Sequence, residues 1–398
     1  MRILWLSGNP SMYASRNKYN GGGWVASLQQ EIVKRYADSV ELAIAFPWVC
    51  NMKDKSDDCI YYGIEDIHRI FWNYKHKESK CLRDIKYVVD EFKPDIIQVF
   101  GTEEKFGLVT TITDIPVIIH LQGVLSAYKE TWLPEGVSWM RHFIHFPKQI
   151  LTFLALNVFI KREQRIFSNT KFIFGRTEWD KGLASLLASQ AQYLYCSEML
   201  RPQIYNSTKV WKINNNKIKH IVSIISPTVY KGEDVILRTA KVLKTFTDID
   251  FVWDVYGIRQ IKYGTLYTHI KPQEVNVYIG GIIDAEQLVN VIVKSDVFVH
   301  PSYIENSPNT VCEAQLLGIP VIATNVGGVS SLIQHNENGV LVSANDVYTM
   351  ASQIKSLLNN TERSEKLGIN GRKTALERHN PEKLVTTLMN GYNQIIDK

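Results

Sequence analysis

The sequence predicts an α/β protein built from two doubly wound domains, and three observations support this fold class. The chain has 398 residues, which is enough for two domains of ordinary size. Short apolar runs alternate with segments of helical periodicity through both halves of the chain. A polar, turn-rich stretch at 205–219 separates the halves. Such alternation is typical of Rossmann-like domains, whose ligands bind beyond the carboxyl ends of the strands.

The first half contains five runs predicted as buried parallel strands. Between the first two, Trp24, Leu28, Ile32 and Tyr36 share one stripe of a predicted helix over 24–36. The predicted strands are Ile3–Leu6, Val40–Phe46, Asp95–Phe100, Val117–His120 and Phe172–Phe174.

The second half repeats the pattern. Helices are predicted at 234–246 and 285–294, and a last one at 381–396. The predicted strands are His220–Ile225, Asp250–Tyr256, Val275–Ile279, Asp296–Val299 and Pro320–Ala323. We therefore expect an N-terminal domain over 1–205 and a C-terminal domain over 206–379.

Composition describes a folded protein and excludes several classes of function. Hydrophobic residues make up 45% and charged residues 21%, and the formal net charge of +5 is too mild to indicate nucleic acid binding. The five cysteines are scattered without CxxC spacing, which favours neither a disulfide framework nor a zinc site. The first apolar run is too short for a signal peptide. We therefore expect a cytoplasmic location.

The most informative stretch runs from His300 to Ala314 and carries Glu305 and Glu313, eight positions apart. A buried strand enters a polar loop, and the loop turns into a helix at Ser307-Pro308, where serine suits the N-cap and proline the first helical position. Unpaired first-turn amides would form an anion site beside the two carboxylates. The amides in question belong to Asn309, Thr310 and Val311. A ligand with a central diphosphate and hydroxyls at both ends, such as a nucleotide-sugar, suits this arrangement.

The segment 137–162 departs from the regular alternation. It contains aromatic and basic residues, then the apolar run Ile150–Ile160, then Lys161-Arg162. This mostly apolar run of eleven residues is too short to span a bilayer. Two interpretations stay open: an interfacial helix that makes peripheral contact with a membrane, or a core or lid helix of the first domain.

With these motifs in place, the sequence resembles the retaining glycosyltransferases of family 4, which have the two-domain GT-B fold. The resemblance covers nearly the whole chain and is strongest from Lys231 to Gly339. Glu305 and Glu313 match the E-x7-E signature of that family. The matching context comprises Pro301-Ser302, Ser307-Pro308-Asn309, Glu313-Ala314, the run from Leu317 to Ala323, and Gly327-Gly328.

The resemblance implies a role for each matched residue. Glu313 would bind the donor ribose, Glu305 the donor sugar, and Lys231 the departing diphosphate, whose growing charge a fixed cation stabilises. His120 would contact the donor near the transferred carbon. The implied donor-binding residues are Gly22, Gly23, Lys231, Ser307, Pro308, Asn309, Thr310 and Glu313.

Other parts of the family pattern are weaker or differ. Arg176 and Glu178 follow a predicted strand and are assigned to the acceptor side. Ser226 stands where the family usually has an arginine, so Arg176 or Arg259 would have to supply that phosphate contact. The family pattern also joins the final segment, 380–398, to the first domain.

The sequence therefore predicts a retaining glycosyltransferase that moves a sugar from a nucleoside-diphosphate donor, preferably a UDP-sugar, to an acceptor hydroxyl. The expected acceptor is a saccharide or lipid-linked saccharide in glycan, polysaccharide or cell-envelope synthesis. No cofactor or metal is expected, because Asp248-Ile-Asp250 lies at the amino end of a strand. A GT-B sugar-nucleotide epimerase and a non-catalytic nucleotide-sugar-binding protein remain alternatives. A dinucleotide oxidoreductase is disfavoured, since no GxGxxG follows the first strand.

Overall fold

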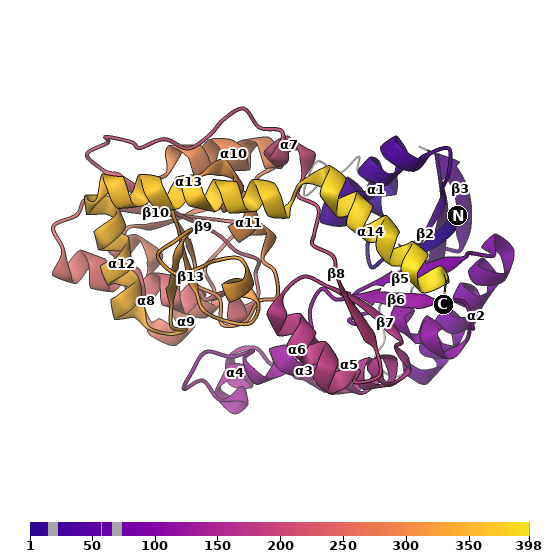
Figure 1. Ribbon diagram of the computed structural model, residues 1–398. Coiled ribbons are helices and arrows are strands. Elements are labelled where there is room, and N and C mark those ends of the chain that lie inside the picture. Colours follow the sequence, from indigo (N-terminus) through magenta and orange to yellow (C-terminus); the bar gives the residue numbers. More distant parts are fainter. Residues whose placement is uncertain (15–22, 57, 66–73, 398) are drawn as a thin grey trace. The chain divides into compact units, whose positions relative to one another are not determined.

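The computed structural model describes residues 1–14, 23–56, 58–65 and 74–397, which form two α/β units (Figure 1). Unit 1 contains residues 1–129, 142–199 and 380–398. Unit 2 contains residues 130–141 and 200–379. The main part of the second unit begins at Leu200, slightly before the predicted boundary. Residues 130–141 also belong to this unit, although the sequence assigned them to the first domain.

The sheet of unit 1 has eight strands in the order β3-β4-β2-β1-β5-β6-β7-β8. All neighbours are parallel except β3 and β4, which form an antiparallel hairpin at one edge. The strands are β1 (Arg2–Leu6), β2 (Glu41–Trp48), β3 (Met52–Ser56), β4 (Cys59–Glu65), β5 (Ile96–Phe100), β6 (Val117–His120), β7 (Phe172–Gly175) and β8 (Gln192–Tyr195).

Helices cover both faces of this sheet, because successive strand residues point to opposite sides. On one face α1 and α14 bury Trp24, Leu28 and Leu388 against Trp5 and Phe174. The opposite face packs against α2, α5 and α6. The helices of this part of the chain are η1 (Ser11–Ala14), α1 (Gly23–Tyr36), α2 (Tyr74–Phe92), η4 (Lys105–Thr111), α3 (Leu125–Glu130), α4 (Trp139–His145), α5 (Gln149–Asn169), α6 (Glu178–Leu187) and α14 (Pro381–Ile396).

The last helix, α14, belongs to unit 1 although it follows unit 2 in the sequence. The hydroxyl of its Tyr392 accepts a hydrogen bond of 3.0 Å from the indole of Trp5 and donates one to Gln98. Tyr392 is fully buried. Figure 1 shows α14 beside α1, over strands from the start of the chain.

The sheet of unit 2 has six parallel strands in the order β11-β10-β9-β12-β13-β14. One face packs against α8 and α12 and the other against α7, α10, α11 and α13. The strands are β9 (Lys219–Ile224), β10 (Phe251–Tyr256), β11 (Val277–Gly281), β12 (Val297–His300), β13 (Val321–Thr324) and β14 (Val340–Val342). The helices are α7 (Pro202–Tyr205), η5 (Val229–Lys231), α8 (Glu233–Phe246), α9 (Tyr263–Thr268), η6 (Pro272–Val275), α10 (Ala285–Lys294), α11 (Asn309–Leu317), η7 (Val329–Ser331), α12 (Val347–Asn359) and α13 (Thr361–Arg378).

The segment 137–162 forms α4 and the first part of α5. Arg162, predicted as a basic flank of an interfacial helix, is instead buried, and its guanidinium donates to the carbonyl of Glu103. The first turns of α5 differ, since Ile150, Leu151 and Leu154 are exposed there. No helix in the described part of the chain has the length and apolar character needed to cross a membrane.

Candidate functional site

The order of strands in unit 2 fixes where its ligand site lies. The chain runs from β9 to β10 and β11 on one side, and then returns to β12 on the other side of β9. A crevice at such a switch point, beyond the carboxyl ends of the strands, is the usual ligand site of doubly wound sheets. The loop after β9 carries Lys231, and the loop after β12 carries Glu305. Two predicted site residues therefore meet at this point.

Lys231 and Glu305 form a buried ion pair. The Lys231 ammonium lies 2.5 Å from Glu305 Oε1, and their side chains are 17% and 7% exposed. The same oxygen accepts a hydrogen bond of 2.8 Å from the Ser302 hydroxyl and lies 3.0 Å from His300 Nε2. Three polar side chains from the two loops thus hold one carboxylate oxygen.

This pairing determines the charge of both partners. Burial works to lower the pKa of Lys231, but the charge and hydrogen bond of Glu305, together with a smaller effect of Tyr230, outweigh it, so the pKa is raised. Burial likewise works to raise the pKa of Glu305, but Lys231 and a hydrogen bond with His300 hold that pKa at about 2. Lys231 is therefore a cation and Glu305 an anion throughout the neutral range.

Two glycines allow these loops to come together. Gly232 has a φ of +78°, and a Cβ at this position would lie 2.2 Å from the carbonyl oxygen of Pro301. Gly327 has a φ of +51°, and its Cβ would lie 1.8 Å from the carbonyl oxygen of Glu305. Since only glycine tolerates both the conformation and the approach, the Lys231-Gly232 and Gly327-Gly328 motifs place the backbone around Glu305.

The helix after Glu305 begins one residue later than predicted. α11 starts at Asn309, so Pro308 is its N-cap and Ser307 precedes the cap, and no side chain caps the helix. The prediction of three unpaired amides is also wrong, because the amide of Val311 donates to the Pro308 carbonyl at 3.0 Å. The amides of Asn309 and Thr310 have no such bond among the described residues. These two amides remain as hydrogen-bond donors at the N-terminus of α11, which is the positive end of the helix dipole.

Glu313 lies one turn further along α11 and already has a strong partner. Both of its oxygens accept hydrogen bonds of 2.8 Å from the Arg201 guanidinium, in a bidentate pair. Their side chains are only 3% and 12% exposed. A carboxylate offers about four lone-pair sites, so a diol can still bind beside the arginine.

Sequence reasoning missed Arg201, because a single arginine before a short helix carries no signal. His300 and Ser302 stood inside the quoted motif and could have been found there.

His120, predicted to contact the donor, lies in the core of unit 1. It is fully buried, its Nε2 lies 3.1 Å from the carbonyl oxygen of Cys196, and its Nδ1 lies 3.3 Å from Gln98 Nε2. Burial, with a smaller effect of Arg176, lowers its pKa to about 3. The ring is therefore neutral near pH 7, and both of its nitrogens have partners in the core of unit 1.

The remaining predicted residues of unit 1 differ in exposure. Arg176 is buried, donates to the Gln122 carbonyl at 2.9 Å and lies 3.7 Å from Glu198. Glu178 is exposed in the first turn of α6, where it pairs with Lys181 at 3.2 Å. Gly23 is the first residue of α1, with a φ of +65°. Gly22 lies outside the described residues.

A further carboxylate, Glu103, lies at the carboxyl edge of the sheet in unit 1. It follows β5 and accepts a hydrogen bond of 2.8 Å from the amide of Gly123, which follows β6. Burial raises its pKa to about 7. The neighbouring Glu163 of α5 is fully buried and binds Thr102 and Ser126 at 2.8 Å, so α5 ties the two loops together.

Two other residues from the sequence argument are placed by the structure. Ser226 lies near the start of the loop after β9, with its hydroxyl 3.2 Å from that of Thr228. Arg259 is exposed after β10, the neighbour of β9, at the same edge of the sheet. Asp248 and Asp250 precede β10, at the opposite end of the strands.

Comparison with known proteins finds a family that the second unit resembles. Residues 207–374 match the family model for glycosyl transferases group 1. The capsular polysaccharide biosynthesis glycosyltransferase CapM of Staphylococcus aureus is 34% identical over 101 residues, which are 25% of this chain and 27% of that protein. The matches span less than half the length of each of the similar curated proteins.

Solved structures cover the whole chain. Sucrose-phosphate synthase from Thermosynechococcus elongatus superposes with a TM-score of 0.77 at 16% identity, over 100% of this chain and 99% of that one. HepE of Anabaena, solved in complex with UDP-glucose, gives a TM-score of 0.65 at 15% identity, over 99% and 100% of the two chains. The chain thus has the GT-B fold, and residues 207–374 of its second unit resemble the glycosyl transferases group 1 family.

Proposed function

We propose that this protein is a retaining glycosyltransferase that transfers a sugar from a nucleoside-diphosphate donor to an acceptor hydroxyl. The observation that carries the proposal is the buried Lys231–Glu305 pair at the switch point of a group 1 glycosyltransferase domain. Similarity to HepE, whose structure contains UDP-glucose, favours a UDP-sugar. The curated relative in capsular polysaccharide synthesis favours a role in polysaccharide or other glycan synthesis.

In the proposed complex the donor diphosphate lies at the mouth of α11. The amides of Asn309 and Thr310 bind its oxygens, and Lys231 exchanges part of its contact with Glu305 for a phosphate oxygen. The charge on the leaving diphosphate grows as the glycosidic bond breaks, so a preorganised ammonium stabilises the transition state more than the ground state. Arg259 supplies the second positive charge for the diphosphate, because Ser226 stands where an arginine would otherwise provide it.

The two glutamates bind opposite ends of the same donor. Glu305 accepts hydrogen bonds from hydroxyls of the transferred sugar, and Glu313, oriented by Arg201, accepts them from the ribose. The acceptor hydroxyl attacks from the face that the diphosphate leaves, and it passes its proton to a diphosphate oxygen, so the anomeric configuration is retained. Positioning and electrostatics supply the catalysis without a metal ion.

The acceptor side belongs to unit 1 in this proposal. Glu103, whose pKa of about 7 lets it donate or accept near neutrality, orients the acceptor hydroxyl. We further propose that the acceptor is lipid-linked and that the exposed start of α5 rests on the membrane surface. Ile144, Ile150, Leu151 and Leu154 supply apolar surface there, and Lys148 supplies a positive charge for anionic lipids.

The test measures sugar transfer by the purified protein. UDP-glucose, UDP-galactose, UDP-N-acetylglucosamine, GDP-mannose and ADP-glucose are offered with a panel of saccharide and lipid-linked saccharide acceptors, and nucleotide release is followed. Lys231→Ala and Glu305→Gln should each lower kcat about 10²- to 10³-fold, the range seen when one transition-state contact is removed. Lys355→Ala, an exposed lysine on α12, is the matched control and should keep full activity.

Three outcomes would contradict the proposal. Full activity in both site variants would remove the assigned roles. Donor isomerisation without any acceptor would identify a sugar-nucleotide epimerase. Donor binding without turnover across the whole panel would identify a binding protein. Proton NMR of the product tests retention separately, since an inverted anomeric configuration rejects the front-face mechanism while leaving glycosyl transfer intact.

A further inference from the structure

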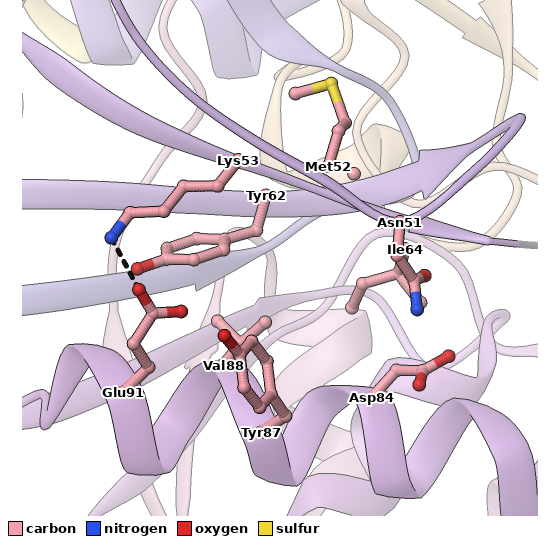
Figure 2. A pocket seen from close by; sticks show the side chains of 10 residues that line it. Asn51, Met52, Lys53, Tyr62, Ile64, Asp84, Tyr87, Val88 and Glu91 are labelled. Carbon is pink, nitrogen blue, oxygen red and sulfur yellow. Dashed lines mark hydrogen bonds and ion pairs between the residues drawn. The ribbon is translucent and has the colours of Figure 1, made fainter.

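A cavity of about 480 Å³ lies in unit 1 between the edge hairpin β3–β4 and the helix α2 (Figure 2). Among the strands, α2 contacts β4 and β2, so β3 extends the sheet past the helix and leaves space under it. In the strand order, β2 and β1 separate β4 from β5, which places the cavity roughly 14 Å from the loop that carries Glu103. The donor-site residues lie in unit 2, so this cavity is a separate feature of the molecule.

The lining combines aromatic rings with hydrogen-bonding groups at both ends. Figure 2 shows Tyr62 and Tyr87 with an ion pair of Lys53 and Glu91 at one end of the cavity. The Lys53 ammonium lies 2.5 Å from Glu91 Oε1 and 5.6 Å from the centre of the Tyr62 ring. Tyr87 projects from α2 with 66% of its surface exposed, so its ring is accessible to a ligand.

The other end of the cavity presents unsatisfied polar groups. Asp84 Oδ2 is shielded from solvent and has no hydrogen-bond partner among the described residues. Asn51 lies above it in Figure 2, and its side-chain carbonyl accepts a hydrogen bond of 2.7 Å from the amide of Glu65. The side-chain NH₂ of Asn51 therefore remains as a donor. The Asp84 oxygen can therefore accept a hydrogen bond from a ligand hydroxyl or amine.

We propose that this cavity binds a neutral saccharide chain, a stretch of the acceptor glycan at some distance from the hydroxyl that reacts. Sugar rings present apolar C–H faces, which pack on tyrosine rings, and pairs of hydroxyls, which donate to carboxylates and accept from amides. Tyr62 and Tyr87 supply the rings, and Asp84 and Asn51 supply the polar partners. The proposal rests on the proposed function only in the identity of the saccharide as acceptor.

The charged side chains that line the cavity favour a neutral ligand over an anionic one. Lys53 is already paired with Glu91, which leaves Asp84 as an uncompensated negative charge. An anionic ligand, such as a nucleotide or an acidic polysaccharide, would bring a like charge against this carboxylate. A neutral chain brings only hydroxyls and C–H groups, and it satisfies Asp84 without repulsion.

The experiment measures saccharide binding to the full-length protein without any donor. Maltohexaose, cellohexaose, chitohexaose and dextran serve as probes in saturation-transfer NMR, and dissociation constants come from titration of the protein. We expect at least one of these probes to bind in the millimolar range or tighter. Asp84→Asn should weaken that binding about tenfold, in line with the loss of a charge-assisted hydrogen bond, and Tyr87→Ala should weaken it similarly.

Matched controls separate a local site from general effects. Asp90→Asn changes an exposed aspartate on the same helix that does not line the cavity, and Tyr278→Ala removes an exposed tyrosine from unit 2. Both should bind the probe as the wild type does. Binding by none of the probes, or equal loss in control and site variants, would overturn the proposal.

The outcome is independent of the donor site. Wild-type donor turnover with a short acceptor in Asp84→Asn would leave the proposed function intact, whatever the binding result. Conversely, saccharide binding that depends on Asp84 in a protein without transferase activity would support this site and reject the proposed function.

Discussion

The two glutamates of the motif have different partners at the scale of single residues. One oxygen of Glu305 contacts the side chains of Lys231, His300 and Ser302. Both oxygens of Glu313 accept hydrogen bonds from Arg201. A buried carboxylate that loses its cationic partner still carries the free-energy cost of desolvation, and no attraction to a positive charge offsets that cost. Arg201→Leu should therefore lower the free energy of unfolding by about 3–5 kcal/mol, measured by urea denaturation.

An exposed pair provides the control for Arg201. Lys86 and Asp90 lie 2.6 Å apart on α2 with roughly half of each side chain exposed. Exposed pairs contribute little, so Lys86→Leu should change the stability by less than about 0.5 kcal/mol. Equal effects of the two substitutions would show that Glu313 does not depend on Arg201.

The lowered pKa of Glu305 predicts how stability depends on pH. The folded pKa is about 2 and the ordinary value 4.5, so the folded state binds fewer protons than the unfolded state between these values. The contribution of Glu305 is thus fully present above pH 4.5 and is lost as the pH falls through about 2. The shift corresponds to roughly 3 kcal/mol.

Comparison of wild type with Glu305→Gln tests this dependence. The difference in unfolding free energy should be constant from pH 8 to 5 and should shrink from pH 4.5 downward. Lys231 does not contribute in this window, because its raised pKa lies in the alkaline range. Urea denaturation at pH 7, 4 and 3 measures the difference, and a value that stays the same at pH 3 would rule out the ion pair as its source.

At the residue scale, the sequence predicts contacts between residues that stand in short local motifs better than contacts between distant residues. Lys231 and Glu305, which the structure brings together, each stand in a local motif with a glycine or a strand end nearby. Arg201 is 112 positions from Glu313, and nothing local marks such a pair. The role of His120 stays a prediction, because its packing beside Trp24 and Phe174 is not visible in the sequence of a strand end.

At the scale of elements, ten of the strands in the described residues were predicted and four were missed: the edge strands β3, β8 and β14, and β4, which lies between β3 and β2. Val117–His120 coincides with β6, and the other predicted strands overlap observed ones with ends that differ by one or two residues. β3, with the sequence Met-Lys-Asp-Lys-Ser, is mostly exposed and lacks the apolar run that identifies a central strand. β8 and β14 are also edge strands, and each is only three or four residues long.

The helix α5 illustrates two environments along one element. Its second half buries Arg162, Glu163 and Phe167 in unit 1, which the sequence alone did not separate from the exposed first half. Leu151, at 55% exposure, lies in that first half and points to a surface that contacts lipid in the proposed function. Leu151→Glu should abolish co-sedimentation with vesicles of phosphatidylcholine and phosphatidylglycerol, because a charge opposes burial in the headgroup region.

Leu186→Glu is the matched control for this surface. Leu186 lies on α6 with 75% of its surface exposed, outside the proposed contact. The variant should sediment with vesicles as the wild type does. Absence of wild-type binding, or equal loss in both variants, would exclude a lipid contact through the start of α5.

At the scale of the whole molecule, the chain passes between the two units four times, at 129/130, 141/142, 199/200 and 379/380. Residues 130–141 pack on unit 2, where the Trp132 ring lies 5.2 Å from that of Tyr230, next to Lys231. The final helix α14 returns to unit 1 and closes its core around Tyr392. Neither unit is therefore one continuous segment, and local sequence patterns did not predict that residues 130–141 join unit 2.

This division of the chain predicts which parts respond to each ligand. Ligands that bind only the native state slow the local opening of the segments they contact. UDP should therefore slow amide hydrogen exchange in unit 2, at the β9 loop through Gly232 and at residues 301–313, and leave β3, β4 and α2 unchanged. A bound neutral hexasaccharide should slow exchange at β3, β4 and α2 instead. Hydrogen-exchange mass spectrometry of the intact chain with each ligand measures both responses. Protection by UDP confined to unit 1 would place the nucleotide away from Lys231 and Glu305, and would contradict the assignment of the donor site to unit 2.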